Sequence, residues 1–151
     1  MTMRSNDAQL LAERVVAGML VTDALSRWLG LEVVEIAPRR SVCRMTVRAE
    51  MVNGFGVAHG GIVYSLADSA FAFACNTHGT VTVAVDNSIT YPAAIHPGDV
   101  LTASAVEEAG SARLGYYRVL VSNQHEVIVA LFTGTAYRTS RPHFPAEAAD
   151  A

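Results

Sequence analysis

One acidic residue, Asp68, stands inside an otherwise apolar and alanine-rich stretch of the sequence that begins at Ile62. The composition of this stretch favours a helix, and apolar residues recur on every side of it, which is typical of a buried helix. Burying an unpaired carboxylate costs roughly several kcal/mol, so the Asp68 side chain must be hydrogen-bonded, paired or placed at a cleft. Asp68 is therefore either a structural acid inside a subunit interface or a group that takes part in chemistry.

A His59-Gly60-Gly61 corner precedes the same stretch. Its glycines expose backbone N–H groups that no side chain covers, and the N-terminus of a helix attracts negative charge. In acyl-transfer chemistry a carboxylate attacks or activates water, and backbone N–H groups hold the developing oxyanion. The acid and the corner together point to such chemistry at a carbonyl carbon, although Gly60 alone could also be only a tight turn.

The spacing of these two groups adds a constraint. Gly60 and Asp68 are eight residues apart, which is about 12 Å along a helix axis at roughly 1.5 Å per residue. One carbonyl carbon cannot touch both groups of a single helix. If they share a site, one of them must come from a second copy of the helix, so the spacing predicts a dimer.

The surrounding sequence predicts the elements that position this helix. Residues 7–20 have helical composition, with Ser5, Asn6 and Asp7 as candidate caps, and Thr22-Asp23 caps a short second helix that ends at Gly30. Trp28 is expected to plug one end of the core. Gly79 is expected to close the central helix.

Strand-like alternation occurs on both sides of the central helix. The predicted strands are residues 31–36, the run containing Cys43, Met45 and Val47, the run in which Val81, Val83, Val85, Ile89 and Tyr91 alternate with polar or small residues, and residues 100–108, 114–122 and 127–137. A single buried helix among many antiparallel strands predicts an α+β fold, in which one curved sheet wraps around the helix.

The composition limits the classes of function. About half of the residues are hydrophobic and 17% are charged, which fits extra surface buried between subunits or a chain merely rich in Ala and Val. The net charge of −3 gives no indication of a basic surface that would bind nucleic acid. The sequence shows neither a run of about 18 apolar residues nor a signal peptide, and we expect Cys43 and Cys75 to be reduced, so the predicted location is the cytoplasm. The five histidines lack metal-ligand spacing, and no metal is predicted.

The run N-G-F-G-V-A-H-G-G-I-V-Y-S-L-A-D-S-A-F-A-F-A-C-N, residues 53–76, resembles the signature of the hotdog-fold acyl-CoA thioesterases, closest to the PaaI-like branch of phenylacetic-acid-degradation thioesterases. The later S-I-T-Y-P-A and P-G-D-V-L-T-A segments also look like that family, and the resemblance covers roughly residues 25–138. It implies a hotdog domain over residues 31–139, after an N-terminal helical segment at residues 1–30. Residues 140–151 are expected to form a disordered tail.

The resemblance also implies an activity. The expected reaction is hydrolysis of an aryl-acetyl-CoA, such as phenylacetyl-CoA or hydroxyphenylacetyl-CoA, to the free acid and CoA. No cofactor is expected, because CoA is part of the substrate. The expected partners are further copies of the chain, as a homodimer or as a dimer of dimers (a homotetramer), and neither nucleic acid nor membrane. The alternatives are a broad medium-chain acyl-CoA thioesterase and a non-catalytic acyl-CoA-binding hotdog protein.

Four catalytic residues follow from the resemblance. Asp68 is expected to act as nucleophile or general base, and the Gly60 N–H to polarise the thioester carbonyl. His59 supports the corner, and Asn53 helps to hold the thioester or the attacking water. The default interpretation of Asn53 is a loop-turn residue.

Two further residues, Gly61 and Ser69, are expected to bind substrate. Ser69 lies next to the acid and could bond to the substrate or to the opposite chain. Some relatives place a serine on the strand after the helix, where this sequence has Ala84. Because Ala84 has no hydroxyl group, the sequence does not support a role for a serine at this position in holding the attacking water.

Overall fold

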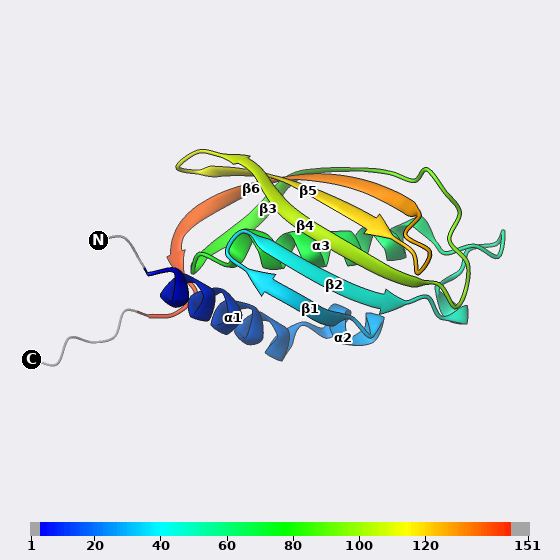
Figure 1. Ribbon diagram of the computed structural model, residues 1–151, viewed down its shortest axis with the longest axis horizontal. Helices are drawn as coiled ribbons and strands as arrows, with labels where there is room; N and C mark the ends of the chain where they lie inside the picture. Colours follow the sequence, from blue (N-terminus) through cyan, green and yellow to red (C-terminus); the bar gives the residue numbers. More distant parts are fainter. Residues whose placement is uncertain (1–3, 146–151) are drawn as a thin grey trace, which may run out of the picture.

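The computed structural model describes residues 4–145 and has the predicted order of elements (Figure 1). These are α1 (Ser5–Thr22), α2 (Ala24–Leu29), β1 (Glu32–Ala37), β2 (Arg40–Thr46), a 3₁₀ turn (Ala49–Met51), α3 (Gly60–Asn76), β3 (Thr80–Thr90), β4 (Val100–Gly110), β5 (Leu114–Ser122) and β6 (Ile128–Pro142). The strands form one antiparallel sheet in the order β1-β2-β4-β5-β6-β3. The predicted α+β class is confirmed.

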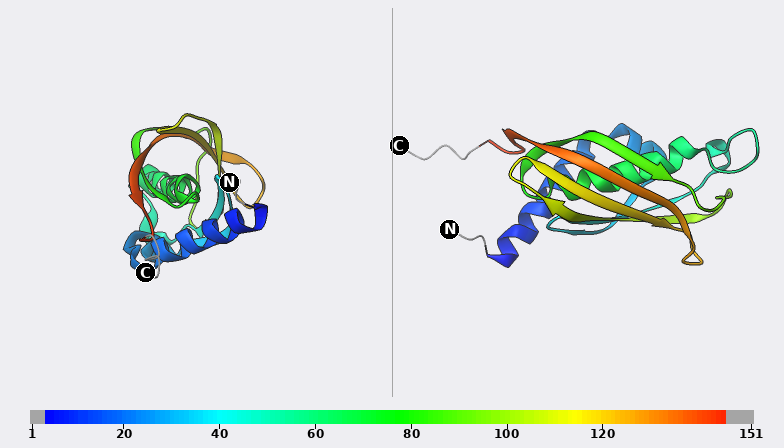
Figure 2. Two further views of the ribbon diagram at one scale, coloured as in Figure 1. Left: turned by 90° about the vertical axis from the view of Figure 1, so that its left-hand side faces the viewer. Right: turned by 90° about the horizontal axis from the view of Figure 1, so that it is seen from above.

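The sheet curves around α3, as the view along that helix shows (Figure 2, left). Phe71 of α3 is fully buried, and its ring centroid lies 5.4 Å from that of Tyr117 on β5 and 5.7 Å from that of Phe132 on β6. A side chain at Gly134 would lie 2.8 Å from the Phe71 ring, so only glycine lets β6 approach the helix here. The sheet is thus fitted closely to one helix, as the sequence pattern predicted.

The N-terminal helices differ in detail from the predictions. The Asp23 side chain caps α2 by accepting a hydrogen bond from the Ser26 N–H, as predicted. The predicted cap of α1 is wrong, because Arg4 occupies the N-cap position and makes no side-chain cap bond. The predicted plug is also wrong: Trp28 is 50% exposed, with the Arg48 guanidinium 5.0 Å from its ring centroid. Leu29 and Ser26 lie on the buried side of this short helix, and Trp28 therefore faces outward.

Strand β3 contains a bulge that changes which of its residues face α3. Its register with β6 shifts by one residue between Ala84 and Asp86. A one-residue shift moves the following side chains to the opposite face. The expected alternation therefore breaks: Val83, before the shift, and Val85, within it, are 46% and 58% exposed, whereas Ile89, beyond it, is half-buried. Beyond the bulge, Asn87 pairs with the buried Gly134 and faces inward.

Helix α3 is not covered on all sides as the sequence suggested. Its second half is buried, but in its first half Tyr64, Ser65 and Asp68 are only half-buried and Gly61 is exposed. Its C-cap is Thr77, and Gly79 lies beyond it with φ at 88°.

The C-terminal tail was predicted to begin at residue 140, which is too early, because β6 continues to Pro142. Residues 146–151 of that predicted tail lie outside the described residues. Within residues 4–145, no helix is long and apolar enough to cross a membrane.

Candidate active site

Within the described part of the chain, the start of α3 presents one backbone N–H without a partner. His59 is the N-cap residue, and its Nδ1 accepts a hydrogen bond from the Gly61 N–H at 2.9 Å. The Gly60 carbonyl accepts a hydrogen bond from the Tyr91 hydroxyl at 2.7 Å. The peptide group between the two glycines is thus fixed at both ends. Among residues 4–145 the Gly60 N–H has no partner, so it is available to a ligand.

Gly61 has a different place from the one expected. Because its N–H already bonds to His59, it does not offer a donor to a substrate in this structure. A side chain at Gly61 would lie 3.1 Å from the His59 Nδ1. Gly61 therefore donates the hydrogen bond that caps the helix and leaves room for the His59 ring. The predicted substrate contact through its N–H is not supported.

Asn53 lies beside this corner. An isolated bridge between Val52 and Ala58, and a hydrogen bond of 2.8 Å from the His59 N–H to the Met51 carbonyl, bring the two ends of the intervening loop together. The Asn53 Oδ1 accepts a hydrogen bond from the Phe55 N–H at 2.9 Å, which confirms the loop-turn interpretation. Its Nδ2 donates to no group within residues 4–145.

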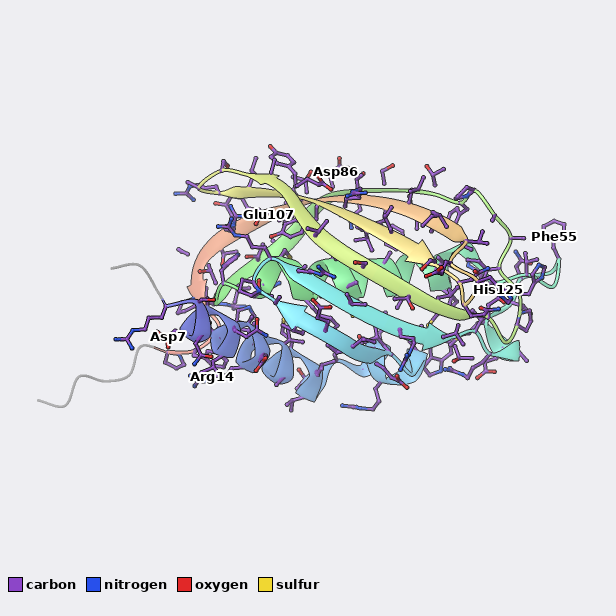
Figure 3. All side chains as sticks on the ribbon, viewed as in Figure 1. Asp7, Arg14, Phe55, Asp86, Glu107 and His125 are labelled. Atoms are coloured by element: carbon purple, nitrogen blue, oxygen red, sulfur yellow. The ribbon has the colours of Figure 1, made fainter. Side chains whose placement is uncertain are left out.

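The tip of the same loop carries an exposed apolar ring. Phe55 is 92% exposed and projects from the end of the molecule where α3 begins (Figure 3). A single exposed apolar side chain is common on protein surfaces and does not by itself indicate a binding site.

Asp68 lies on the side of α3 that faces β3. Its Oδ1 accepts a hydrogen bond of 3.1 Å from Asn87 Nδ2, which also donates to the Tyr64 hydroxyl at 2.9 Å. Burial raises the pKa of the Asp68 carboxyl above its ordinary value, and the hydrogen bond from Asn87 opposes this rise. Asp68 is thus half-buried, close to one amide, and a stronger base than a solvated aspartate.

Ser69 does not join Asp68. Its hydroxyl oxygen lies 3.4 Å from that of Ser26, which in turn donates to Asp23 at 2.6 Å. Consecutive residues of a helix point about 100° apart, so Ser69 faces α2 whereas Asp68 faces β3. The structure therefore places Ser69 in the contact between α2 and α3, and not beside Asp68.

The structure separates the predicted catalytic residues into two groups. Asn53, His59 and Gly60 lie at the start of α3, and Asp68 lies eight residues further along the same helix. The axial distance of about 12 Å expected for this spacing therefore applies within one chain. The predicted site combines both groups, and within one chain the structure keeps them apart.

Three contributors to these halves were missed. Tyr91 orients the Gly60 peptide, and Asn87 and Tyr64 contact each other beside Asp68. The four-residue spacing of Tyr64 and Asp68 on a helix could have indicated that they share a face. Asn87 gave no such signal, because the bulge that turns it inward has no clear mark in the sequence.

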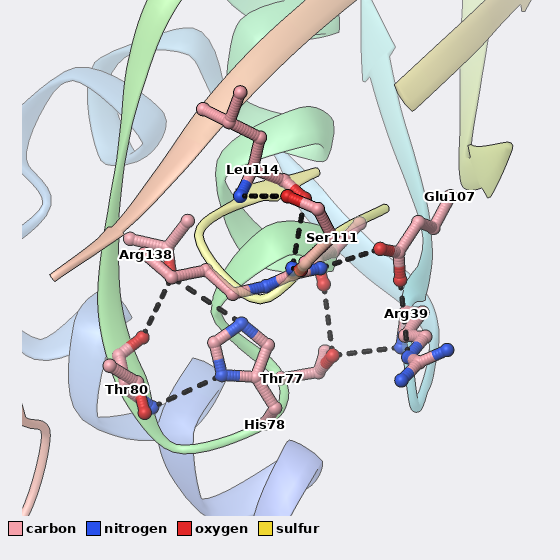
Figure 4. A network of polar contacts seen from close by, with 10 residues as sticks. Arg39, Thr77, His78, Thr80, Glu107, Ser111, Leu114 and Arg138 are labelled. Carbon is pink, nitrogen blue, oxygen red and sulfur yellow. Dashed lines mark hydrogen bonds and ion pairs between the residues drawn. The ribbon is translucent and has the colours of Figure 1, made fainter. Parts of the chain in front are cut away.

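A second polar cluster, at the far end of β4 and β6, has a structural explanation (Figure 4). The Glu107 side chain is only 7% exposed, and its two carboxylate oxygens lie 2.6 Å from Arg138 Nη2 and 3.1 Å from Arg39 Nε. Arg138 also donates to the backbone carbonyls of Ser111 and Leu114. Arg138 thus ties the buried Glu107 carboxylate to the turn between β4 and β5, which gives the cluster a structural role.

The chain is similar to known thioesterases. The family model "Thioesterase superfamily" matches residues 55–130, just over half of the chain. Acyl-coenzyme A thioesterase PaaI of Escherichia coli strain K12 is 38% identical over 120 residues, which cover 80% of this chain and 86% of PaaI.

Solved structures agree with this match. That of E. coli PaaI, from the phenylacetic acid degradation operon, has a TM-score of 0.87 at 35% identity and covers 89% of this chain and 98% of its own. The TT0310 protein from Thermus thermophilus has a TM-score of 0.75 at 44% identity, covering 78% and 98%. A hypothetical thioesterase of Streptococcus pneumoniae, solved with coenzyme A, has a TM-score of 0.71 at 25% identity, covering 74% and 88%. This chain belongs to the thioesterase superfamily, and is a thioester hydrolase with the hotdog fold of the PaaI-like branch.

Proposed function

We propose that this chain hydrolyses acyl-CoA thioesters with an aryl-acetyl group, such as phenylacetyl-CoA or hydroxyphenylacetyl-CoA, to the free acid and CoA. The observation that carries the proposal is the unpartnered Gly60 N–H at the start of α3, together with the half-buried Asp68 on the same helix. The two groups provide an oxyanion donor and a base or nucleophile, which are the two functions that thioester hydrolysis needs.

The proposed reaction uses one group from each of two chains. The thioester carbonyl oxygen accepts a hydrogen bond from the Gly60 N–H of one chain, and Asn53 of that chain helps to hold the thioester or the water. Asp68 of the other chain either takes a proton from water as it attacks the carbonyl carbon, or attacks that carbon itself. If water attacks, the carbon–sulfur bond breaks, Asp68 returns the proton to the CoA sulfur, and the water oxygen becomes the second carboxylate oxygen of the product. If Asp68 attacks, the carbon–sulfur bond breaks to give a mixed anhydride with Asp68 and a CoA thiolate that is protonated by solvent, and water then hydrolyses the anhydride to the free acid.

The free edge of the sheet supports a homodimer. Strand β3 has eleven residues and ends the sheet, and no other strand of residues 4–145 pairs with its outer edge. A long edge strand with exposed apolar residues, here Val83 and Val85, associates readily with another strand. Antiparallel pairing of two β3 strands would run the two α3 helices in opposite directions. The start of one α3 would then lie nearer to Asp68 of the other, as the shared site requires.

The acyl group and the location are supported by different observations. The aryl-acetyl substrate rests on the similarity to E. coli PaaI and the operon that encodes it. The proposed location is the cytoplasm, in keeping with Cys43 and Cys75, which are both buried and unpaired. A broader thioesterase for medium-chain acyl groups and a non-catalytic acyl-CoA-binding protein are the alternatives, and assembly as a dimer of dimers is part of the proposal.

A thiol-release assay tests the proposal. The protein is mixed with a panel of phenylacetyl, hydroxyphenylacetyl, medium-chain and short-chain CoA esters in the presence of a thiol-reactive dye. Burial raises the pKa of both cysteine thiols to about 12, so the native protein contributes little background. The highest kcat/KM is expected for the aryl-acetyl esters. A preference for medium-chain esters would favour the broad thioesterase, and binding without thiol release would favour the binding protein.

A further inference from the structure

Asn87 contacts Asp68 only because of the bulge in β3. Before the bulge Ala84 pairs with the buried Ala136, and after it Asn87 pairs with the buried Gly134. Without the extra residue Asp86 would pair with Gly134, so the bulge turns the Asn87 amide, rather than the Asp86 carboxylate, toward α3. Bulges often lie beside active sites, where they re-aim a side chain.

The hydrogen bonds of Asn87 are unevenly satisfied. Its Nδ2 donates to Asp68 Oδ1 at 3.1 Å and to the Tyr64 hydroxyl at 2.9 Å, which uses both of its hydrogens. Its Oδ1 is buried and has no partner in the described part of the chain. If the amide were turned round, its oxygen could accept from Tyr64 but would face the Asp68 carboxylate. Contact with the carboxylate is therefore kept although it leaves an acceptor unsatisfied, which calls for a functional explanation.

We propose that Asn87 is a positioning residue for the hydrolysis, whose amide holds the Asp68 carboxylate in its reactive orientation while the Tyr64 hydroxyl fixes the amide. This inference rests on the proposed function. Asn87 occupies Oδ1 of Asp68, and no group within residues 4–145 bonds to Oδ2. Oδ2 is thus the oxygen that is left for water or the thioester. Tyr64 is itself held by an edge-on contact with Phe132, at 5.6 Å between ring centroids.

The same contact favours the ionised form of Asp68. Burial raises the pKa of this carboxyl, and the hydrogen bond from Asn87 lowers it. The titratable neighbours on α3 are Tyr64 and Cys75, and the pKa of Cys75 is raised to about 12, so its thiol is uncharged near neutral pH. On β3 the only acid is Asp86, which is exposed on the bulge and lies at the outer surface of the sheet (Figure 3). Asn87 is therefore the group that offsets the effect of burial.

The test replaces Asn87 with a side chain of similar shape that cannot donate. In Asn87→Leu, kcat should fall about tenfold or more with KM changed by less than about twofold, and the acid limb of the pH–kcat profile should move up by about one pH unit. The melting temperature should stay well above the assay temperature, because removal of the unsatisfied Oδ1 offsets part of the cost of the higher Asp68 pKa. Thr133→Ala, on the outward face of β6, is the control and should leave kcat, KM, the acid limb and the melting temperature unchanged.

Two further measurements test the contact independently. Tyr64→Phe should move kcat and the acid limb in the same direction by smaller amounts, and it serves if Asn87→Leu does not fold. The pKa of Asp68, measured by NMR of the carboxyl carbon in the free protein, should rise in Asn87→Leu whether or not a substrate is known.

The outcomes separate this inference from the proposed function. An unchanged Asp68 pKa and an unchanged acid limb would overturn the inference, as would a loss of rate explained by a lower melting temperature. A wild-type protein that hydrolyses no thioester, but in which the Asp68 pKa still responds to Asn87, would overturn the proposed function and leave the contact intact.

Discussion

Replacing Asp68 with asparagine should lower activity and raise stability together. The amide oxygen introduced by Asp68→Asn can still accept the Asn87 hydrogen bond of 3.1 Å, so the change removes the charge and the basicity but keeps the geometry. Losing a positioned base typically costs about 100-fold or more in kcat, which corresponds to about 2.7 kcal/mol of transition-state stabilisation. Thiol release from phenylacetyl-CoA under saturating substrate measures this loss.

The stability effect follows from the raised pKa of Asp68. A carboxyl whose pKa is higher in the folded than in the unfolded protein destabilises the fold once it ionises, and this loss disappears as the pH falls below the ordinary carboxyl range. Asp68→Asn should therefore be more stable than wild type at pH 7 by less than about 1.4 kcal/mol, since the half-buried carboxylate is partly screened. Urea unfolding at pH 7 and at pH 3.5 measures the difference, which should vanish at the lower pH. Full activity would refute the catalytic role, and a less stable variant at pH 7 would favour the structural interpretation of this acid.

Two other substitutions test the oxyanion donor and the second polar cluster. Gly60→Pro removes the free N–H at the first position of α3, where proline is tolerated, and should lower kcat about 100- to 1,000-fold. Gly60→Ala is its control, because it keeps the N–H but places the same Cβ 3.1 Å from the Tyr91 hydroxyl; equal losses in the two variants would reject the donor role. Arg138→Met should lower the free energy of unfolding by about 3–5 kcal/mol, because it leaves the buried Glu107 carboxylate with only the exposed Arg39. Arg118→Met, which breaks an exposed ion pair, should cost less than about 1 kcal/mol in the same urea titration, and a similar cost for both variants would contradict this account of the cluster.

Much of the fold could be predicted because its signals are local. The change from helical to two-residue periodicity and the turn residues located every strand, and the ends of β4 and β5 fall within about two residues of the predicted ones. The mid-helix acid and the glycine corner were also visible, since each conflicts with the pattern around it. Trp28 was misplaced because a short helix gives no reliable indication of which side faces the core.

The features that could not be predicted depend on contacts between distant parts of the chain. The bulge in β3 is defined by its pairing with β6, and only that pairing turns Asn87 toward Asp68. Ser69 matched an expected position in sequence, but its contact with Ser26 on α2 depends on how two helices pack. The spacing of Gly60 and Asp68 predicted that a second chain completes the proposed site, but no local pattern describes how two chains would associate.

The most direct test of the shared site is complementation between two inactive variants. Asn53→Ala damages the half-site at the start of α3, and Asp68→Ala damages the half-site two turns further along. In a mixed dimer, one site collects both lesions and the other collects neither. Co-expression of differently tagged chains, followed by isolation of the mixed dimer, should therefore restore thiol release to about half of the wild-type value. If both groups acted within one chain, every site would keep a lesion, so a purified mixed dimer without activity would contradict the shared site.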